Sequence, residues 1–328
     1  MKQRPNFRMA AGSKVVEGFF WGVSKIGKLH PLARPERHGV EVFRDLSYLD
    51  SGMREHRLDI YRPSDAKGPL PVCLYVHGGG FRILSKDSHW IMGLIFARRG
   101  YLVINVNYRL APRHPYPSAV EDICAAYQWM LEHAHEWGGD LSRLVFAGES
   151  AGANLITALT IALCYEREEH FAKRAHAHGV LPKAVVPACG IFEVSNPSRF
   201  RSMGVSRFVE DRIVEVSREY LPDTLSAIEL ELANPLHIFE RGDLPTRPLP
   251  PFFAPCGALD PLHHDTLRLG AALPKLGAVC ETRLYDRGHH AFHAFVLFPN
   301  ARQCWRDTFE FLGRYIAGQL TPVPASPQ

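Results

Sequence analysis

The sequence predicts an α/β fold in which helices cover both faces of a mostly parallel, eight-stranded sheet. Strand-like and helix-like segments alternate from residue 40 onward, which is typical of a parallel sheet. The segment 153–163 is apolar on nearly every face, as expected of a helix buried at the centre of such a protein. The chain has 328 residues, 46% of them hydrophobic, which suffices for one large core.

Apolar runs and their spacing place the individual elements. Short apolar or β-branched runs predict strands at residues 40–48, 56–61, 70–76, 101–106, 143–147, 184–189, 251–256 and 280–285. We expect the first two strands at an edge of the sheet and the next two at its centre. Apolar residues at helical spacing or in a continuous run predict helices at residues 118–135, 153–163, 262–276 and 296–316.

Two regions interrupt this alternation. Residues 1–39 contain a short amphipathic helix pattern, and residues 193–248 are helical and punctuated by proline. Insertions after strand carboxyl ends lie over the site face of such sheets. We therefore expect both regions to form a helical cap on a catalytic domain made of residues 40–192 and 249–317. Residues 318–328 are expected to be a disordered tail.

Composition excludes several classes of function. The formal net charge is only +4 and no basic stripe occurs, so nucleic-acid binding is not expected. The seven cysteines are scattered and odd in number, which predicts buried thiols in a reducing compartment rather than disulfides or a zinc site. The sequence shows neither a signal-peptide core nor a run of membrane-spanning length. Together these features predict a cytoplasmic protein with no membrane partner.

Residues 148–152 read GESAG and lie between the strand 143–147 and the following apolar helix. A serine in this context sits on a turn too tight for side chains at the glycine positions, and its hydroxyl stands clear of the sheet. The following helix points its positive N-terminus at the same place. Ser150 is therefore predicted to be a nucleophile rather than a serine that only caps a helix.

A serine hydroxyl becomes nucleophilic when a base takes its proton, usually a histidine that a carboxylate orients. In this type of fold the partners follow in the order serine, acid, histidine. Asp260 follows the strand 251–256, and His290 lies in the loop after the last strand. We therefore predict Asp260 as the acid and His290 as the base.

Other residues compete for these roles. Asp265 lies a turn further into the helix after Asp260 and is expected to be a structural charge. The competing bases are His289 and His293. The nearby His263 and His264 raise the alternative of a metal site, but His289 and His290 are adjacent and do not easily share one ion, so no metal is expected.

Acyl transfer also requires hydrogen-bond donors for the oxyanion that forms during attack. Residues 77–80 read HGGG and follow the strand 70–76, and three glycines leave backbone N–H groups open to a ligand. The N–H groups of Gly79, Gly80 and Ala151 are predicted to form the oxyanion hole. The residues expected to support this loop are His77, Tyr108 and Arg109.

These motifs occur together in the order and at the spacing of a known family. They are residues 77–80 (HGGG), 107–112 (NYRLAP), 148–152 (GESAG), 260–262 (DPL) and 290–292 (HAF). Over about residues 40–317 the chain resembles the hormone-sensitive-lipase-like family of α/β-hydrolase esterases. The resemblance implies an α/β-hydrolase fold with a helical cap, serine carboxylesterase activity on short or medium acyl chains, and no cofactor. Relatives in this family often form homodimers through the last strand and helix.

Three positions depart from the family pattern. Glu149 stands where the family usually has Asp or Thr, Arg113 where an acidic residue is usual, and Ala291 where Gly is usual. None of these changes removes a catalytic group. We expect Glu149 to change the polar support of the turn that carries Ser150, and so to affect the rate rather than the chemistry.

The sequence therefore predicts hydrolysis of a small carboxylic ester through an acyl-enzyme. An amidase, a lactonase or another acyl transferase would use the same residues, because the cap selects the leaving group. A non-catalytic ligand-binding member of the fold is disfavoured by the presence of serine, acid and histidine. An interfacial lipase is disfavoured because no large, continuous apolar lid is visible in the sequence.

Overall fold

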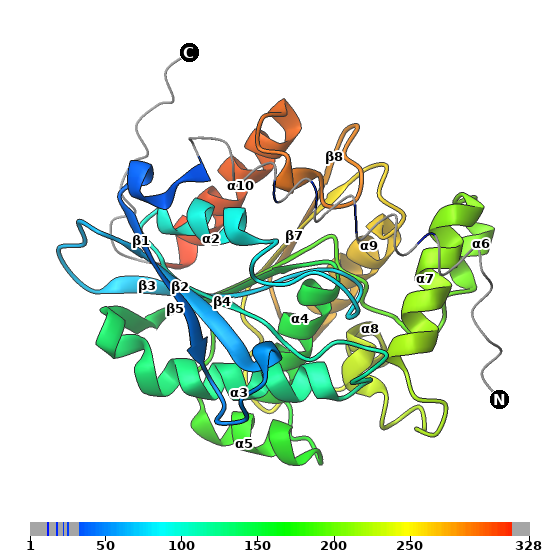
Figure 1. Ribbon diagram of the computed structural model, residues 1–328. Helices are drawn as coiled ribbons and strands as arrows, with labels where there is room; N and C mark the ends of the chain where they lie inside the picture. Colours follow the sequence, from blue (N-terminus) through cyan, green and yellow to red (C-terminus); the bar gives the residue numbers. More distant parts are fainter. Residues whose placement is uncertain (1–11, 13–17, 19–21, 23–24, 26–32, 317–328) are drawn as a thin grey trace.

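The computed structural model describes residues 12, 18, 22, 25 and 33–316 (Figure 1). These residues contain an eight-stranded sheet with the order β1-β2-β4-β3-β5-β6-β7-β8. The strands are β1 (Val40–Ser47), β2 (Arg57–Pro63), β3 (Leu70–Val76), β4 (Leu102–Val106), β5 (Gly139–Glu149), β6 (Ala184–Ala188), β7 (Phe252–Gly257) and β8 (Cys280–Tyr285). Strand β2 pairs antiparallel with β1 and β4, and all other pairs of this sheet are parallel. The predicted sheet is thus confirmed.

Helices cover both faces of the sheet (Figure 1). The described α-helices are α2 (Trp90–Ala97), α3 (Ser118–His133), α4 (Ala151–Cys164), α5 (His170–His178), α6 (Arg199–Ser202), α7 (Arg207–Tyr220), α8 (Pro235–Arg241), α9 (His263–Ala272) and α10 (Pro299–Tyr315). In β3, Val72 and Leu74 join the core that includes α3 and α4, whereas Cys73 and Tyr75 join the core that includes α2 and α10. Because strand side chains alternate between faces, this central strand is buried on both sides.

The helices differ from the prediction in a few places. Helices α2 and α5 were not predicted, and α2 is hydrophobic at nearly every position, so it lacks the period that marks an amphipathic helix. The helix predicted at 262–276 ends as α9 at Ala272, and a 3-10 turn at Leu273–Leu276 follows because Pro274 disfavours further α-helix. The helix predicted at 296–316 begins at Pro299, a residue type favoured in the first helical turn.

The stretch 193–248 contains α6, α7, α8 and the 3-10 helix Glu231–Ala233. Polar contacts fix its beginning to α9: Asp265 Oδ2 accepts a hydrogen bond from Phe192 N at 2.9 Å and from Arg199 Nη2 at 2.7 Å. These bonds satisfy a fully buried carboxylate and a backbone N–H at once. They anchor the start of the stretch on α9.

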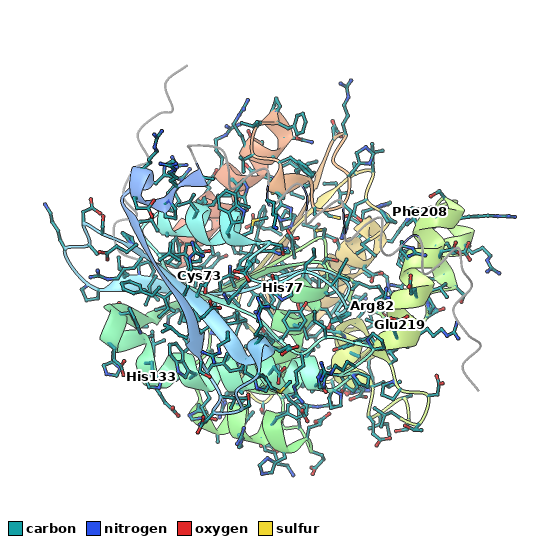
Figure 2. The ribbon with its side chains drawn as sticks, in the orientation of Figure 1. Cys73, His77, Arg82, His133, Phe208 and Glu219 are labelled. Atoms are coloured by element: carbon teal, nitrogen blue, oxygen red, sulfur yellow. The ribbon has the colours of Figure 1, made fainter. Side chains whose placement is uncertain are left out.

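Helix α7 is fixed in turn to the loop that follows β3. Arg82 in this loop donates to Glu215 at 2.9 Å and to Glu219 at 2.5 Å, and Figure 2 shows Arg82 and Glu219 next to each other. The stretch 193–248 therefore reaches the carboxyl end of β3, and its role as a cap stays a prediction.

Two predicted segments fall largely outside the described part of the chain. Most of the predicted cap segment 1–39 and the entire tail 318–328 belong to the residues that the structure does not describe. None of the described helices combines the length and the apolar character that crossing a bilayer requires.

Candidate active site

Ser150 stands at the turn between β5 and α4 in a backbone conformation that non-glycine residues rarely adopt. Its φ is +53° and its ψ is −114°. Ser150 N donates to Ala188 O at 2.9 Å, and Asn154 N donates to Ser150 O at 3.2 Å. A Cβ on Gly152 would lie 2.1 Å from Val76 O, so only glycine lets α4 pass this close to β3. The turn is thus held in its strained form from both sides.

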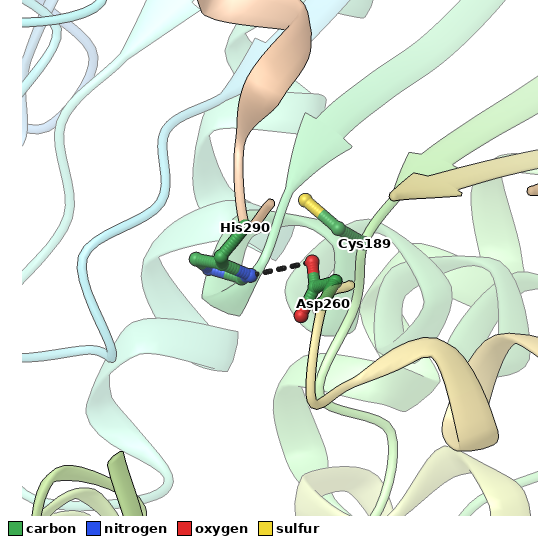
Figure 3. Close-up of side chains that lie close together, drawn as sticks. All are labelled: Cys189, Asp260 and His290. Atoms are coloured by element: carbon green, nitrogen blue, oxygen red, sulfur yellow. Dashed lines mark hydrogen bonds and ion pairs between the residues drawn. The ribbon is translucent and has the colours of Figure 1, made fainter. Parts of the chain in front are cut away.

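The structure brings together the three residues predicted as nucleophile, acid and base. His290 Nε2 lies 3.0 Å from Ser150 Oγ. His290 Nδ1 lies 2.8 Å from Asp260 Oδ2, the contact drawn in Figure 3. Asp260 is fully buried, and its Oδ1 accepts a hydrogen bond from Leu262 N at 2.8 Å. The loops after β7 and β8 can meet here because Gly257 has no side chain: a Cβ there would lie 2.2 Å from the backbone oxygen of residue 288.

The electrostatics of this arrangement favour a protonated His290. Burial by itself lowers the pKa of His290, but the charge and hydrogen bond of Asp260 outweigh burial and raise it above the ordinary value. The negative charge of Glu149 acts in the same direction. Since Nδ1 keeps its proton and donates it in a hydrogen bond to Asp260, Nε2 of the neutral ring is left to accept the proton of Ser150 Oγ.

The glycine loop after β3 has the backbone that its sequence predicts. Gly79 has a φ of +115° and Gly80 a φ of +59°, both in the left-handed range that favours glycine. A Cβ on Gly79 would lie 2.0 Å from Ile83 O. Among the described residues, the N–H groups of Gly79, Gly80 and Ala151 have no hydrogen-bond acceptor, so they are available to a ligand.

Residues next to this loop hold it in place. Tyr108 Oη donates to His77 O at 3.0 Å, and the two rings stack with centroids 4.3 Å apart. Burial lowers the pKa of His77 to about 3, so its ring is neutral and its Nδ1 donates to Gly78 O at 2.7 Å. Arg109 pairs with the buried Asp122 at 2.7 Å. The contacts of Tyr108 and His77 thus support the loop, whereas Arg109 is held to α3.

Glu149 occupies a buried site between two histidines. Its Oε1 lies 2.8 Å from His89 Nε2, and its Oε2 lies 2.9 Å from His293 Nε2. All three side chains are nearly inaccessible to solvent. His89 was not singled out in the sequence because it lies 60 residues before Glu149, at the start of a helix with no distinguishing motif. His89 follows the polar run SKDS at residues 85–88 and precedes the apolar helix α2, so its local sequence did not mark it.

The competing candidates take other places. Asp265 is buried against Arg199, as expected of a structural charge. His289 is exposed, and His293 faces Glu149 rather than Ser150. His263 Nδ1 lies 2.7 Å from Asp260 O, at the start of α9.

Cys189 adds a third metal-ligand type beside Asp260 and His290. One atom of each residue lies within 4.8 Å of the other two (Figure 3). Two ligands of a tetrahedral zinc ion lie about 3.3 Å apart. The 2.8 Å between His290 Nδ1 and Asp260 Oδ2 is instead the length of a hydrogen bond. The geometry favours the hydrogen bond, and a metal-free site stays a prediction.

Comparison with known proteins relates this geometry to a family. Residues 73–294 match the family model described as alpha/beta hydrolase fold. Esterase LipI of Mycobacterium tuberculosis is 32% identical over 216 residues, which cover 64% of this chain and only 62% of that protein. Versiconal hemiacetal acetate esterase of Dothistroma septosporum is 27% identical over 310 residues, which cover 93% of this chain and 89% of that protein.

A solved structure extends the comparison. The crystal structure of an esterase from the bacterial hormone-sensitive lipase family has a TM-score of 0.67 and 26% identity, and the match covers 85% of this chain and 86% of that one. The chain therefore belongs to the α/β-hydrolase fold family, within its hormone-sensitive-lipase-like branch.

Proposed function

We propose that the protein is a serine carboxylesterase that hydrolyses esters of short- to medium-chain carboxylic acids. The observation that carries this proposal is the hydrogen-bonded line from Ser150 Oγ through His290 to the buried Asp260. A hydroxyl, an imidazole and a carboxylate in this arrangement are the groups that acyl transfer to serine requires. The relatives named above are esterases, one of them named for an acetate ester, which favours an ester substrate over an amide.

The reaction begins when Ser150 Oγ attacks the ester carbonyl and His290 Nε2 takes the serine proton. The resulting oxyanion receives hydrogen bonds from the N–H groups of Gly79, Gly80 and Ala151. His290 then gives its proton to the leaving alcohol, and the acyl group stays on Ser150. A water molecule that His290 deprotonates attacks this acyl-enzyme, and the acid leaves as Ser150 regains its proton.

The stretch 193–248 is proposed as the cap, and its helix α7 as the part that limits the length of the acyl chain. A Cβ on Gly80 would lie 2.7 Å from Val216 Cγ2, so α7 packs directly against the oxyanion loop. A helix this close to the reacting carbonyl restricts the space beside it. Short and medium acyl chains are therefore the proposed substrates.

The test is hydrolysis of p-nitrophenyl esters from acetyl to palmitoyl by the wild-type protein, by Ser150→Ala and by the control Ser142→Ala. Ser142 is exposed and lies at the opposite end of β5 from Ser150. We expect the wild type and Ser142→Ala to turn over short and medium esters. Ser150→Ala should lose at least about 1,000-fold in kcat, because nucleophile and base act as one unit.

Other outcomes of this test would indicate other substrates or another nucleophile. Turnover of long chains alone would indicate a lipase. If no ester is hydrolysed in a Ser150-dependent manner, amide and lactone substrates come next. Wild-type rates in Ser150→Ala would remove the proposed nucleophile.

A further inference from the structure

The buried carboxylate of Glu149 joins three parts of the site that are far apart in the sequence. Glu149 itself directly precedes Ser150 in the turn between β5 and α4. Its partner His89 lies directly before α2, at the end of the segment that begins with the glycine loop 77–80. Its other partner, His293, lies three residues after His290. One side chain therefore contacts the segments that carry the nucleophile, the oxyanion donors and the base.

The two oxygens of Glu149 meet the histidines in different ways. A carboxylate only accepts hydrogen bonds, so in the bond between His89 Nε2 and Oε1 the histidine is the donor, whereas His293 Nε2 and Oε2 form a close ion pair. Burial raises the pKa of Glu149, but the two histidines outweigh burial and hold it well below its usual range. Glu149 is thus ionised, with a hydrogen bond at Oε1 and an ion pair at Oε2.

Both histidines are themselves held in place. His89 Nδ1 lies 2.9 Å from Ser88 Oγ and 3.2 Å from Ser85 O. Trp305 Nε1 in α10 donates to His293 O at 2.9 Å. The carboxylate therefore connects two fixed points rather than two mobile side chains.

The glycine loop packs directly on the carboxylate. A Cβ on Gly78 would lie 3.1 Å from both Oε1 and the backbone oxygen of Glu149. Gly78 N lies 3.3 Å from His89 Nε2, the same ring nitrogen that lies 2.8 Å from Glu149 Oε1. A shift of Glu149 would therefore move the loop next to Gly79 and Gly80.

We propose that Glu149, held between His89 and His293, is a positioning residue that fixes the oxyanion loop, the nucleophile turn and the His290 loop relative to one another. This inference rests on the proposed esterase function. Its consequence is that the cluster acts on the rate of acyl transfer and little on substrate binding.

The test compares Glu149→Gln with the control Glu231→Gln. Glu231 is also buried and bound to two cationic side chains, Arg167 at 2.6 Å and Arg241, but it lies in a 3-10 helix outside the three site segments. In Glu149→Gln the amide oxygen accepts a hydrogen bond from one histidine and the NH₂ faces the other, so one connection is lost.

We expect Glu149→Gln to lower kcat by about 10- to 100-fold with KM changed less than about three-fold, because small displacements of catalytic groups are costly. The acid limb of its pH profile should move to lower pH, because Glu149 no longer favours protonated His290. Glu149→Asp keeps the charge, so its acid limb should stay in place while kcat falls because the shorter side chain reaches one histidine only. Glu231→Gln should leave kcat and the acid limb unchanged.

Active-site titration separates positioning from folding. A p-nitrophenyl phosphonate transfers its phosphonyl group to an activated serine and releases p-nitrophenol, which counts the competent sites. Glu149→Gln sites that titrate fully but turn over slowly support the proposal. Wild-type kcat per titrated site, with an unmoved acid limb, overturns it.

The same probe keeps this inference separate from the proposed function. If the wild type hydrolyses no ester, the rate of phosphonylation of Ser150 still reports its activation. In that case a slower reaction in Glu149→Gln than in Glu231→Gln supports the positioning role, and equal rates refute it.

Discussion

The predicted reactivity of the Ser150 hydroxyl depends on His290 and Asp260, which lie far from it in the sequence. The sequence motif of Ser150 predicted the turn, and the order serine, acid, histidine along the chain predicted the acid and the base. The structure brings Ser150, Asp260 and His290 within hydrogen-bonding distance. The environment of Glu149 was not predictable to the same extent. Only the family pattern marked this position, and its contact with His89 spans 60 residues that no local pattern connects.

The pH dependence of the proposed reaction follows from His290. Its pKa is raised in the folded protein by Asp260, which outweighs the effect of burial. The base must be neutral, so kcat/KM should fall as the pH drops through this raised pKa, with an acid limb above about pH 6.5, the ordinary histidine value. A pH profile of p-nitrophenyl acetate hydrolysis measures the limb, and a rate that stays flat down to about pH 5 would exclude His290 as the base.

The contribution of His290 to folding stability depends on pH in the opposite direction to its contribution to activity. A raised pKa in the folded state means that protonation favours folding. This contribution is present below the unfolded pKa and is lost as the pH rises through the folded one. Loss of activity at acid pH should therefore not coincide with unfolding of the part around His290.

At the scale of elements, strands were predicted more reliably than helices. The strands of the sheet are apolar on both faces or alternate, and each predicted strand overlaps an observed one. Helix α2 was missed because it is buried among other elements and has no polar face. Helix α5 was missed because its short length carries few apolar positions, with Ala172 and Ala175 the buried ones.

Asp265 tests how the stretch 193–248 is attached to α9. The carboxylate is fully buried, and its pKa is raised by burial even though it faces Arg199. Asp265→Ala should lower the free energy of unfolding by about 3 kcal/mol, because it removes the buried carboxylate that accepts hydrogen bonds from Arg199 Nη2 and Phe192 N. Urea denaturation measures this loss.

The control for this variant is the exposed pair of Glu168 and Lys173. Glu168→Gln should leave the denaturation midpoint unchanged, because an exposed ion pair contributes little. If Asp265→Ala and Glu168→Gln unfold at the same urea concentration, Asp265 does not anchor the stretch.

For the whole molecule, the sequence predicted the fold because the local patterns agree with one another along the chain. It could not predict the order of the strands in space, in which β3 lies between β4 and β5. This order places the carboxyl ends of β3 and β5 side by side, and with them the glycine loop and Ser150. The contacts that create the site are therefore long-range, which local patterns do not encode.

The distribution of thiols over the whole molecule is also testable. All seven cysteines are free, and six of them are buried. Burial raises the pKa of Cys124, Cys164 and Cys304 to about 12, and it raises the pKa of the other four as well. Because the thiolate is the reactive form, the native protein should react slowly with Ellman's reagent at pH 8.

The denatured, unreduced protein serves as the reference for this reaction. It should release seven equivalents of thionitrobenzoate. A smaller number would show that some cysteines form disulfides, and rapid reaction of the native protein would contradict their burial.

The complete burial of α4 has a consequence for how the protein folds. Every residue of α4 is shielded from water, so the helix gains its stability only when the strands and helices around it have assembled. The pairing of β3 with β5 joins residues as far apart as Cys73 and Val145, and such long loops close slowly. Since Ser150 is held by the first turn of α4, its reactive conformation belongs to a late stage of folding. A partly folded chain therefore carries the sequence motif of the nucleophile without its reactivity.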